Sequence, residues 1–265
     1  KRDVQLLAAV EKILGNEKKI SEITPGLIDD YRHIRKKDPS PTKKGASIAP
    51  ATINKETSQL ITMLNKAVSH GKLNQNPLAG KIKKLVEDNV RKKVLNQEEF
   101  ERLVSELKSP LREMFIVAFY LCMRQGEIIK LTWSSVDLEE GFIRLPAENT
   151  KNNLSRVVPI HPFVDECLKQ VEKKDGEDRV FLSNGKPINQ FSGNFQRQWK
   201  DATKKVGLED FHFHDSRHCS INNLRLAQND YFRIMAISGH KTMSVFKRYN
   251  YVTEDELKNV KWRQI

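Results

Sequence analysis

The chain lacks the features that carry a protein into or across a membrane. No run of about 18 apolar residues is present, so the sequence predicts no helix that spans a bilayer. No leader with a basic start, an apolar middle and a small-residue cleavage site opens the chain. We therefore expect a cytoplasmic protein without a membrane partner. Because the first residue is Lys1 rather than methionine, we also expect a piece of a longer protein.

Cysteine is scarce as well. The three cysteines, Cys122, Cys167 and Cys219, are odd in number and far apart in the sequence. That spacing fits neither a disulfide framework nor a zinc knuckle. We expect buried free thiols in a protein of a reducing compartment.

Charge of one sign is abundant. Lys and Arg number 46 against 34 Asp and Glu, which gives a formal charge of +12 and a pI near 9.5. Such a balance favours a polyanionic partner, and nucleic acid is the commonest one. An anionic membrane surface is the rival on charge alone.

The first part of the chain is predicted to be helical and basic. Apolar residues recur at helical spacing over 3–13, 25–31 and, most clearly, 51–70. Residues 79–94 are crowded with charge and are interpreted as a helical tail followed by an exposed connection. We place a helical domain at 1–85, a linker at 86–95 and a second domain at 96–265.

The second part is predicted to mix helix with a little strand. The apolar stretch 111–131 predicts a buried helix pair or one bent helix. Short β-type runs at 141–145 and 156–160 flank a polar turn, which predicts a hairpin. From Phe163 onward we expect helices joined by short turns. The fold class is therefore mainly α with a small β-hairpin or sheet.

The densest polar cluster runs from His212 to His218 and contains three histidines. A metal site is one interpretation, but a metal-binding HxHxDH pattern would need Asp where Ser216 stands, and no HExxH occurs. Anion chemistry is the other interpretation. If a helix opens here, His214 and Arg217 lie three residues apart, share a face and can donate to one phosphate.

A second cation is expected, because the transition state of phosphodiester chemistry spreads charge over two non-bridging oxygens. Arg124 is the candidate, since it interrupts an otherwise apolar run and must be paired or face a site. Glu127, three residues on, could hold it in place. A buried Arg–Glu pair without any other role is the alternative.

Five further segments follow one another along the chain: Leu121–Ile128, Thr150-Lys151 with Arg156–Ile160, His214–His218, Ser238-Gly239-His240, and Lys247-Arg248-Tyr249. In this order and spacing they resemble the motifs of tyrosine recombinases, the phage integrase family. The resemblance extends almost end to end, because Pro50–Glu56 and Asn76-Pro77-Leu78 resemble the helical, SAM-like core DNA-binding domain ahead of the catalytic domain. The family usually has Thr-Gly where Leu121-Cys122 stands, Leu at Ser216 and Thr at Cys219; these residues neighbour the catalytic set.

What the resemblance implies is site-specific recombination of mobile DNA through a 3′-phosphotyrosyl intermediate. Tyr249 would be the nucleophile, although Tyr120, Tyr231 and Tyr251 are rivals on the sequence alone. The remaining implied roles are phosphate binding by Arg124 and Arg217, a hydrogen bond from His240, general base catalysis by His214 and protonation of the leaving group by Lys151. No metal or other cofactor is implied, because fixed cations already face the phosphate.

Partners follow from the same resemblance. Double-stranded DNA is expected in a clamp between the two domains. Thr52, Asn54 and Lys55, at the start of the clearest helix, either reach a groove or are ordinary surface positions, and the sequence leaves both open. A homotetramer on paired sites is expected, with possible accessory DNA-bending or excision factors, in a prokaryotic or phage-encoded system. A catalytically silent DNA-binding module and a DNA-relaxing enzyme of the type IB topoisomerase kind remain alternatives.

Overall fold

The computed structural model divides the chain into two compact units, residues 1–90 and 91–265. The structure describes residues 2–15, 17–41, 45–87, 93–150, 153–191, 193–246 and 258. Each unit is described by itself. Among the described residues, no helix is both long enough and apolar enough to cross a membrane.

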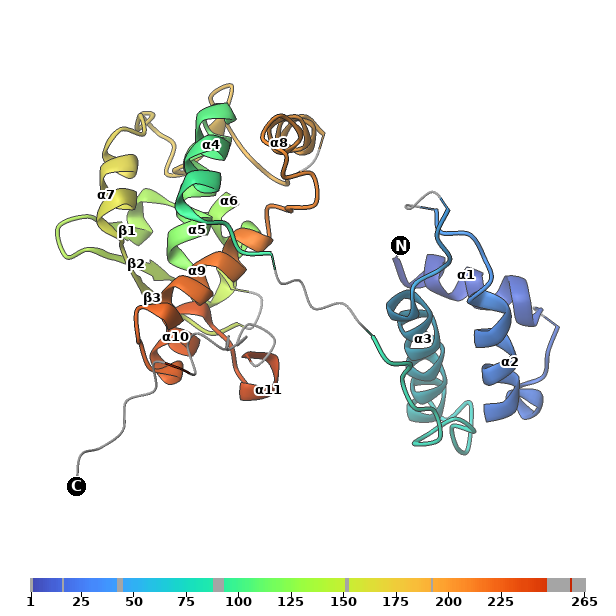
Figure 1. The fold of residues 1–265 in the computed structure, drawn as a ribbon. Coiled ribbons are helices and arrows are strands. Elements are labelled where there is room, and N and C mark those ends of the chain that lie inside the picture. The colour runs from blue at the N-terminus through green and yellow to red at the C-terminus, as the bar shows by residue number, and fades with distance from the viewer. Residues whose placement is uncertain are drawn as a thin grey trace. The chain divides into compact units, whose positions relative to one another are not determined.

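Unit 1 is a group of helices around a small apolar core (Figure 1). Thr24 begins the second helix by accepting a hydrogen bond from Leu27 N–H through its hydroxyl, at 3.2 Å. Buried Glu56 joins two helices, because it accepts from Tyr31 Oη at 2.6 Å and pairs with Arg35 at 2.7 Å. The helices are α1 (Arg2–Leu14), α2 (Pro25–Arg35) and α3 (Pro50–Ser69).

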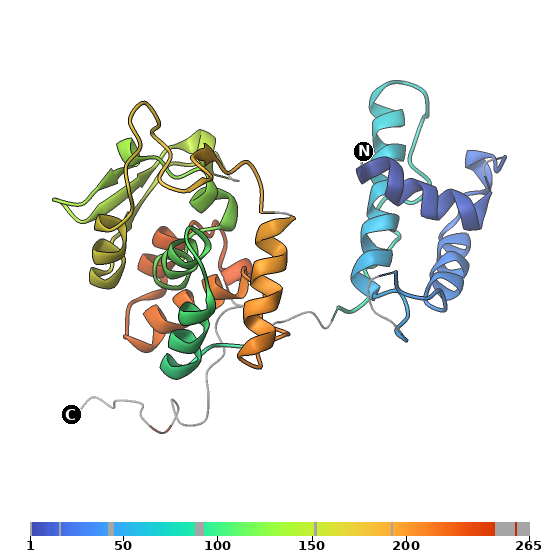
Figure 2. The same ribbon diagram turned by 90° about the horizontal axis from the view of Figure 1, so that it is seen from above.

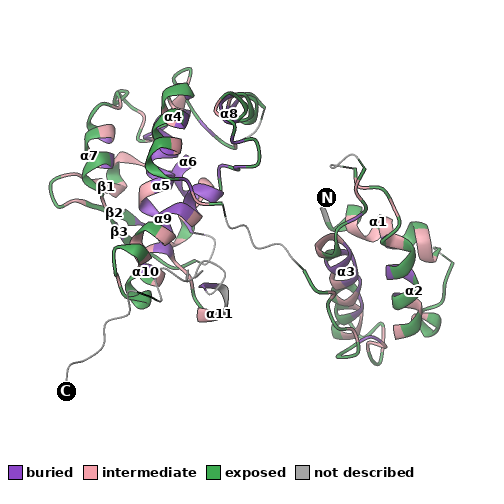
Figure 3. Ribbon diagram, in the orientation of Figure 1, coloured by how far each residue is buried: buried purple, intermediate pink, exposed green. Residues whose placement is uncertain are grey.

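Unit 2 is built around one helix, α5 (Leu111–Leu121), which is apolar on nearly every side and therefore lies in the interior. Figure 3 shows buried residues concentrated on α5 and on α9, which packs against it. The other helices are α4 (Gln97–Glu106), α6 (Gln125–Ile129), α7 (Pro162–Lys169), α8 (Asn194–Lys205), α9 (Asp215–Leu226), α10 (Tyr231–Ser238) and α11 (Met243–Phe246).

A small antiparallel sheet, in the order β1-β2-β3, lies at one edge of this helical body (Figures 1 and 2). Its central strand alternates between exposed and buried side chains, as a strand with one solvated face does. Strand β3 packs against α10, which brings the sheet to the C-terminal helices. The strands are β1 (Val136–Asp137), β2 (Phe142–Leu145) and β3 (Arg156–Pro159), with a separate two-stranded ribbon of β4 (Leu182–Ser183) and β5 (Lys186–Pro187).

Several predictions of secondary structure are confirmed. The apolar stretch 111–131 forms a helix pair, α5 and α6, interrupted at Cys122 by a left-handed backbone with φ 53°. The predicted hairpin is the pairing of β2 with β3, in which Phe142 faces Pro159 and Leu145 faces Arg156.

Two predictions are wrong. Residues 82–87 form no helix, although a helical tail was predicted there. Their backbone instead bonds to a helix of the same unit. The side-chain amide of Asn54, in α3, donates to Leu85 O at 2.9 Å and accepts from Leu85 N–H at 2.8 Å. The part of the chain after Phe163 also contains β4 and β5, which are too short to show a strand period.

Candidate active site

The turn after α5 places Arg124 at the start of α6. Arg124 has an extended backbone, and its N–H donates to Glu127 Oε2 at 2.7 Å, so the Glu127 side chain caps the start of α6. The guanidinium returns to the same carboxylate, with Nη1 2.8 Å from Oε1. Glu127 therefore fixes both the backbone and the side chain of Arg124, as predicted.

Glu127 also pairs with a second arginine that the sequence interpretation did not single out. Arg156, at the start of β3, donates from Nη1 to Oε1 at 3.0 Å and from Nη2 to Oε2 at 2.6 Å. The Glu127 side chain is only 2% exposed. Burial alone would raise its pKa, but the hydrogen bonds and charge of Arg156, with further hydrogen bonds from Arg124, hold the pKa below its ordinary value.

One signal for Arg156 was present in the sequence. Arg156 and Val158 are two residues apart in a strand, so they face the same side, and Val158 is fully buried. An arginine in phase with a buried position needs a partner. The alternation of the hairpin therefore indicates that Arg156 is paired, but it does not identify Glu127 as the partner.

Arg217 lies on the first turn of α9 and is the largest of the fully buried side chains. Its Nη1 donates to Cys122 O and its Nη2 to Ser238 O, the latter at 2.5 Å. Nη2 also lies 3.3 Å from His240 Nε2. Arg217 thus joins the turn after α5 to the end of α10.

The C-terminal end of α10 collects all three arginines. Three successive carbonyls accept from them: Ile237 O from Arg156 Nε at 2.8 Å, Ser238 O from Arg217, and Gly239 O from Arg124 Nη2 at 3.1 Å. The last carbonyls of a helix lack partners within the helix and carry partial negative charge. They are therefore a natural place to hold guanidinium groups.

Gly239 is required where it stands for two reasons. Its φ of +70° is a left-handed conformation, and a Cβ on it would lie 3.2 Å from Arg156 Cδ. The next residue, His240, turns back so that Nδ1 lies 2.7 Å from Ser238 Oγ. Burial, followed by the charges of Arg217, Arg124, Arg156 and His218, lowers the His240 pKa to about 3.

The exposed fractions of these side chains show which side of the cluster faces solvent. Arg217 is 1% exposed, whereas Arg124 and His240 are partly exposed. Together with Arg156 and Glu127, these side chains carry a net charge of +2. We name Arg124, Arg156, Arg217, His240 and Glu127 the arginine cluster. Its chemistry is that of an anion site approached from the side of Arg124 and His240.

His214 precedes α9 as its N-cap residue and is exposed. Its ring lies edge-on to that of His218, with centroids 6.2 Å apart. Because Arg217 is buried, the two residues differ in exposure rather than sharing one exposed face. Within the described residues, no three His, Cys, Asp or Glu side chains are grouped to hold a metal ion.

Two predicted catalytic residues, Lys151 and Tyr249, lie outside the described residues, as does the rival Tyr251. The neighbour of Lys151, Thr150, is described and buried. Its hydroxyl donates to Ala147 O at 3.0 Å and accepts from Leu154 N–H at 3.0 Å, which fixes one end of the predicted hairpin tip.

The three residues predicted to reach a DNA groove have different environments. On the first turns of α3, Lys55 is exposed and Thr52 is partly exposed. Asn54 is 3% exposed, and its amide is bonded to the backbone of Leu85 and, at 2.7 Å, to Glu87 Oε1. That placement does not fit a groove contact by Asn54, because the amide already holds the segment that follows the helices.

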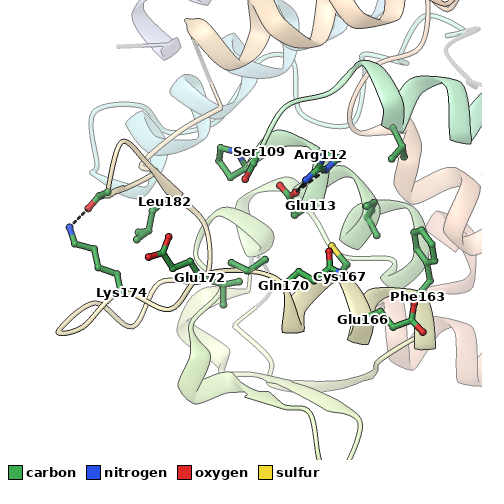
Figure 4. Close-up of a pocket in the computed structure, with 16 residues that line it drawn as sticks. Ser109, Arg112, Glu113, Phe163, Glu166, Cys167, Gln170, Glu172, Lys174 and Leu182 are labelled. Atoms are coloured by element: carbon green, nitrogen blue, oxygen red, sulfur yellow. Dashed lines mark hydrogen bonds and ion pairs between the residues drawn. The ribbon is translucent and has the colours of Figure 1, made fainter.

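A hollow of about 910 Å³ lies elsewhere on unit 2. Figure 4 shows Arg112, Glu113, Cys167 and Lys174 among the side chains that line it, from the start of α5 and from α7 and the loop beyond it. No member of the arginine cluster lines it. The charged side chains that line the hollow are three glutamates against one arginine and one lysine, so it offers no excess positive charge to a phosphate, and the cluster remains the candidate site.

Comparison with known proteins gives one family for both units. Residues 93–256 match the model of the phage integrase family, and residues 1–102 match the phage integrase SAM-like domain. A shufflon-specific DNA recombinase of Escherichia coli is 32% identical over 237 residues, 88% of this chain and 59% of that protein. The integrase of Salmonella phage P22 is 25% identical over 268 residues, 96% of this chain and 67% of that protein. The chain thus spans 59% of the length of the shufflon-specific recombinase.

Solved structures show the same fold. The Tn1549 transposon integrase in complex with transposon right end DNA superposes with a TM-score of 0.69 at 18% identity, covering 97% of both chains. A lambda integrase dimer bound to a COC′ core site also gives 0.69, at 19% identity, covering 100% of this chain and 90% of that one. The mainly helical architecture with a small sheet and a helical N-terminal domain is therefore confirmed.

Proposed function

The chain belongs to the phage integrase family, and we propose that it is a site-specific DNA recombinase acting through a 3′-phosphotyrosyl intermediate. The observation that supports this most strongly is the arginine cluster. Segments near residues 124, 156, 217 and 240 converge on one helix end, where three guanidinium groups and a histidine lie together. A DNA phosphate is the anion that the basic chain favours.

The reaction is a pair of transesterifications. The Tyr249 oxygen attacks a DNA phosphorus atom, a phosphotyrosyl ester forms and the bond from phosphorus to the 5′-oxygen breaks. The tyrosine proton passes to His214, and Lys151 delivers a proton to the departing 5′-oxygen, which leaves as a hydroxyl. One ester replaces another, so the reverse attack by a 5′-hydroxyl rejoins DNA without ATP.

Two members of the arginine cluster bind the reacting phosphate directly. Arg124 and Arg217 hold the two non-bridging oxygens, where negative charge builds up in the transition state. Their carbonyl and carboxylate partners order both guanidinium groups before DNA arrives. The pKa of free tyrosine is about 10, so Tyr249 needs a base to take its proton near neutral pH. His214, which is exposed at the start of α9, takes that role.

A nicked suicide duplex, made from the DNA that flanks the source gene, tests the chemistry. Cleavage releases a short fragment that cannot rejoin, so the covalent adduct accumulates. We expect an adduct with the unaltered chain and none with Tyr249→Phe, which removes only the hydroxyl and should bind the duplex equally well. Tyr251→Phe is the matched control and should retain the adduct. Peptide mapping that places DNA on Tyr251 would contradict the assignment.

Assembly is part of the proposal. Recombination exchanges strands between two sites, so we expect four protomers around paired duplexes, with accessory DNA-bending or excision factors setting direction. Residues beyond Tyr249 include a short apolar set, Leu257, Val260 and Trp262, too small to bury itself as an isolated helix. Docking of this segment on a neighbouring protomer would link assembly to the nucleophile.

Truncation tests the assembly. Deleting the residues after Thr253 should leave single-site binding nearly unchanged and should reduce paired-site complexes and recombination. Normal recombination by the truncated chain would exclude docking between protomers. Relaxation of supercoiled DNA that needs neither paired sites nor several protomers would instead indicate a type IB relaxing activity.

A further inference from the structure

His240 is a neutral imidazole over the ordinary working range of pH. Burial disfavours its charged form, and the positive groups that face it, Arg217, Arg124, Arg156 and His218, disfavour it further. A neutral imidazole carries one proton on its two ring nitrogens. Whether His240 can donate to a phosphate therefore depends on which nitrogen holds that proton.

Ser238 is in a fixed position beside one of those nitrogens. It is the last residue of α10, it is 0% exposed, and Gly239 then reverses the chain so that His240 lies over it. Ser238 Oγ lies 2.7 Å from His240 Nδ1 and 3.4 Å from Met235 O. A hydroxyl can either donate to Nδ1 or accept from it.

Without DNA, one arrangement of protons satisfies all these contacts. Arg217 can only donate, so Nη2–H points at His240 Nε2, 3.3 Å away, and Nε2 has no proton. The proton is then on Nδ1 and is donated to Ser238 Oγ, whose own hydrogen points at Met235 O. In this state His240 presents no donor at Nε2.

We infer that Ser238 is a positioning residue that selects the tautomer of His240, a step that rests on the proposed recombinase function. When a DNA phosphate reaches the arginine cluster, its oxygens accept the Arg217 hydrogens. The Ser238 hydroxyl turns from Met235 O to donate to Nδ1, and the imidazole proton is then held on Nε2. Nε2–H donates to a phosphate oxygen. An apolar residue at 238 has no hydrogen to offer Nδ1.

The experiment reads the tautomer directly. Long-range ¹H–¹⁵N NMR of histidine-labelled protein separates Nδ1–H from Nε2–H, and a His240→Gln spectrum assigns the signal among the seven histidines. A Tyr249→Phe background keeps the bound duplex uncleaved. We expect Nδ1–H without DNA and Nε2–H with DNA, and we expect Ser238→Ala to lose the Nε2–H state.

Single-turnover cleavage of the suicide duplex gives the second readout. Losing one hydrogen bond in the transition state predicts a rate about tenfold lower for Ser238→Ala, with DNA affinity changed less than about twofold. Ser238→Thr keeps a hydroxyl and should recover most of the rate. Ser216→Ala is the matched control, because Ser216 is another fully buried serine but its hydroxyl has no described hydrogen-bond partner.

Each outcome decides one question. A Ser238→Ala protein with the wild-type tautomer in the DNA complex would overturn the inference, whether or not its rate falls, because a rate loss alone indicates a structural defect. If Ser238→Ala loses both the Nε2–H tautomer and the cleavage rate, and Ser238→Thr retains both, the inference is supported. Absence of any adduct from the unaltered chain would refute the recombinase function, while the tautomer measurement would still decide the part played by Ser238.

Discussion

Replacing Glu127 by glutamine removes one charge from the interior of unit 2 while hardly changing the volume of the side chain. The carboxylate holds Arg156 through two hydrogen bonds of 3.0 and 2.6 Å and Arg124 through Nη1 at 2.8 Å. Glutamine offers one acceptor oxygen, and its NH₂ group faces a donor. At least one guanidinium therefore loses its partner.

Burial sets the size of the effect. The side chains of Glu127, Arg156 and Arg124 are 2%, 8% and 20% exposed, so water can replace the lost partner only at Arg124. Removing one member of a buried ion pair costs about 3–5 kcal/mol. The partial exposure of Arg124 favours the lower end, about 3 kcal/mol. With a urea dependence of about 2 kcal/mol per molar, the midpoint should fall by about 1.5 M.

Tryptophan fluorescence reports on this unit alone. The three tryptophans, Trp133, Trp199 and Trp262, all belong to residues 91–265. Urea unfolding of the full chain, followed at this signal, therefore measures unit 2 without a contribution from unit 1. Glu139→Gln is the control, since Glu139 is exposed and should change stability by less than about 0.5 kcal/mol.

The pH dependence tests the electrostatic reason. The pKa of Glu127 is lowered in the folded state, below its ordinary 4.5, so its stabilisation is complete above that value and is lost as pH falls through the folded pKa. The stability gap between the unaltered chain and Glu127→Gln should be flat from pH 6 to 8 and shrink below about pH 4. A gap that widens on acidification would mean that burial outweighs the arginines and would refute the reasoning.

Other predictions concern neighbouring positions. Ser216→Ala should raise the stability of unit 2 by about 1 kcal/mol in the same assay, because it removes a buried hydroxyl without a described partner. Arg217→Lys should lower the cleavage rate at least about 100-fold with little change in DNA affinity, since an ammonium cannot replace the fork that joins Cys122 O to Ser238 O. Lys55→Gln should weaken binding evenly across sequences and reduce the salt slope by about 1 in filter-binding titrations. Cleavage should persist in EDTA, because guanidinium groups supply the positive charge at the phosphate.

Local signals in the sequence predicted the elements that local interactions stabilise. Asn96 and Glu99, three residues apart in the sequence, form a capping box at the start of α4, with reciprocal hydrogen bonds of 2.8 and 3.0 Å. The same is true of α3 and of the hairpin, whose periods extend over several residues. Strands β1, β4 and β5 have two residues each, too few for any period to appear.

The failure of the predicted helical tail at 82–87 has a tertiary cause. Charged residues at helical spacing are compatible with a helix, but here the backbone of 82–87 has partners far away in the sequence. Arg32 Nη2 donates to Lys83 O at 2.8 Å, and the amide of Asn54 bonds to both backbone groups of Leu85. The same contacts explain why Asn54 is inside the domain. A sequence shows that a side chain is polar, but it does not show which distant backbone atom the side chain hydrogen-bonds.

The arginine cluster shows the same limit at the site. The sequence identified Arg124 and Arg217 by residue type and spacing, and His240 through the resemblance to tyrosine recombinases. What holds these side chains together is a set of peptide carbonyls, which every residue has and which no residue type indicates. A helix end carries about half a negative charge, and the carbonyls at the end of α10 accept from three guanidinium groups, two of which also pair with the carboxylate of Glu127. These dipoles stabilise the excess cations in the absence of DNA without neutralising them. A full carboxylate for each arginine would cancel the charge that must meet the phosphate, so the use of carbonyls keeps the site both ordered and positive.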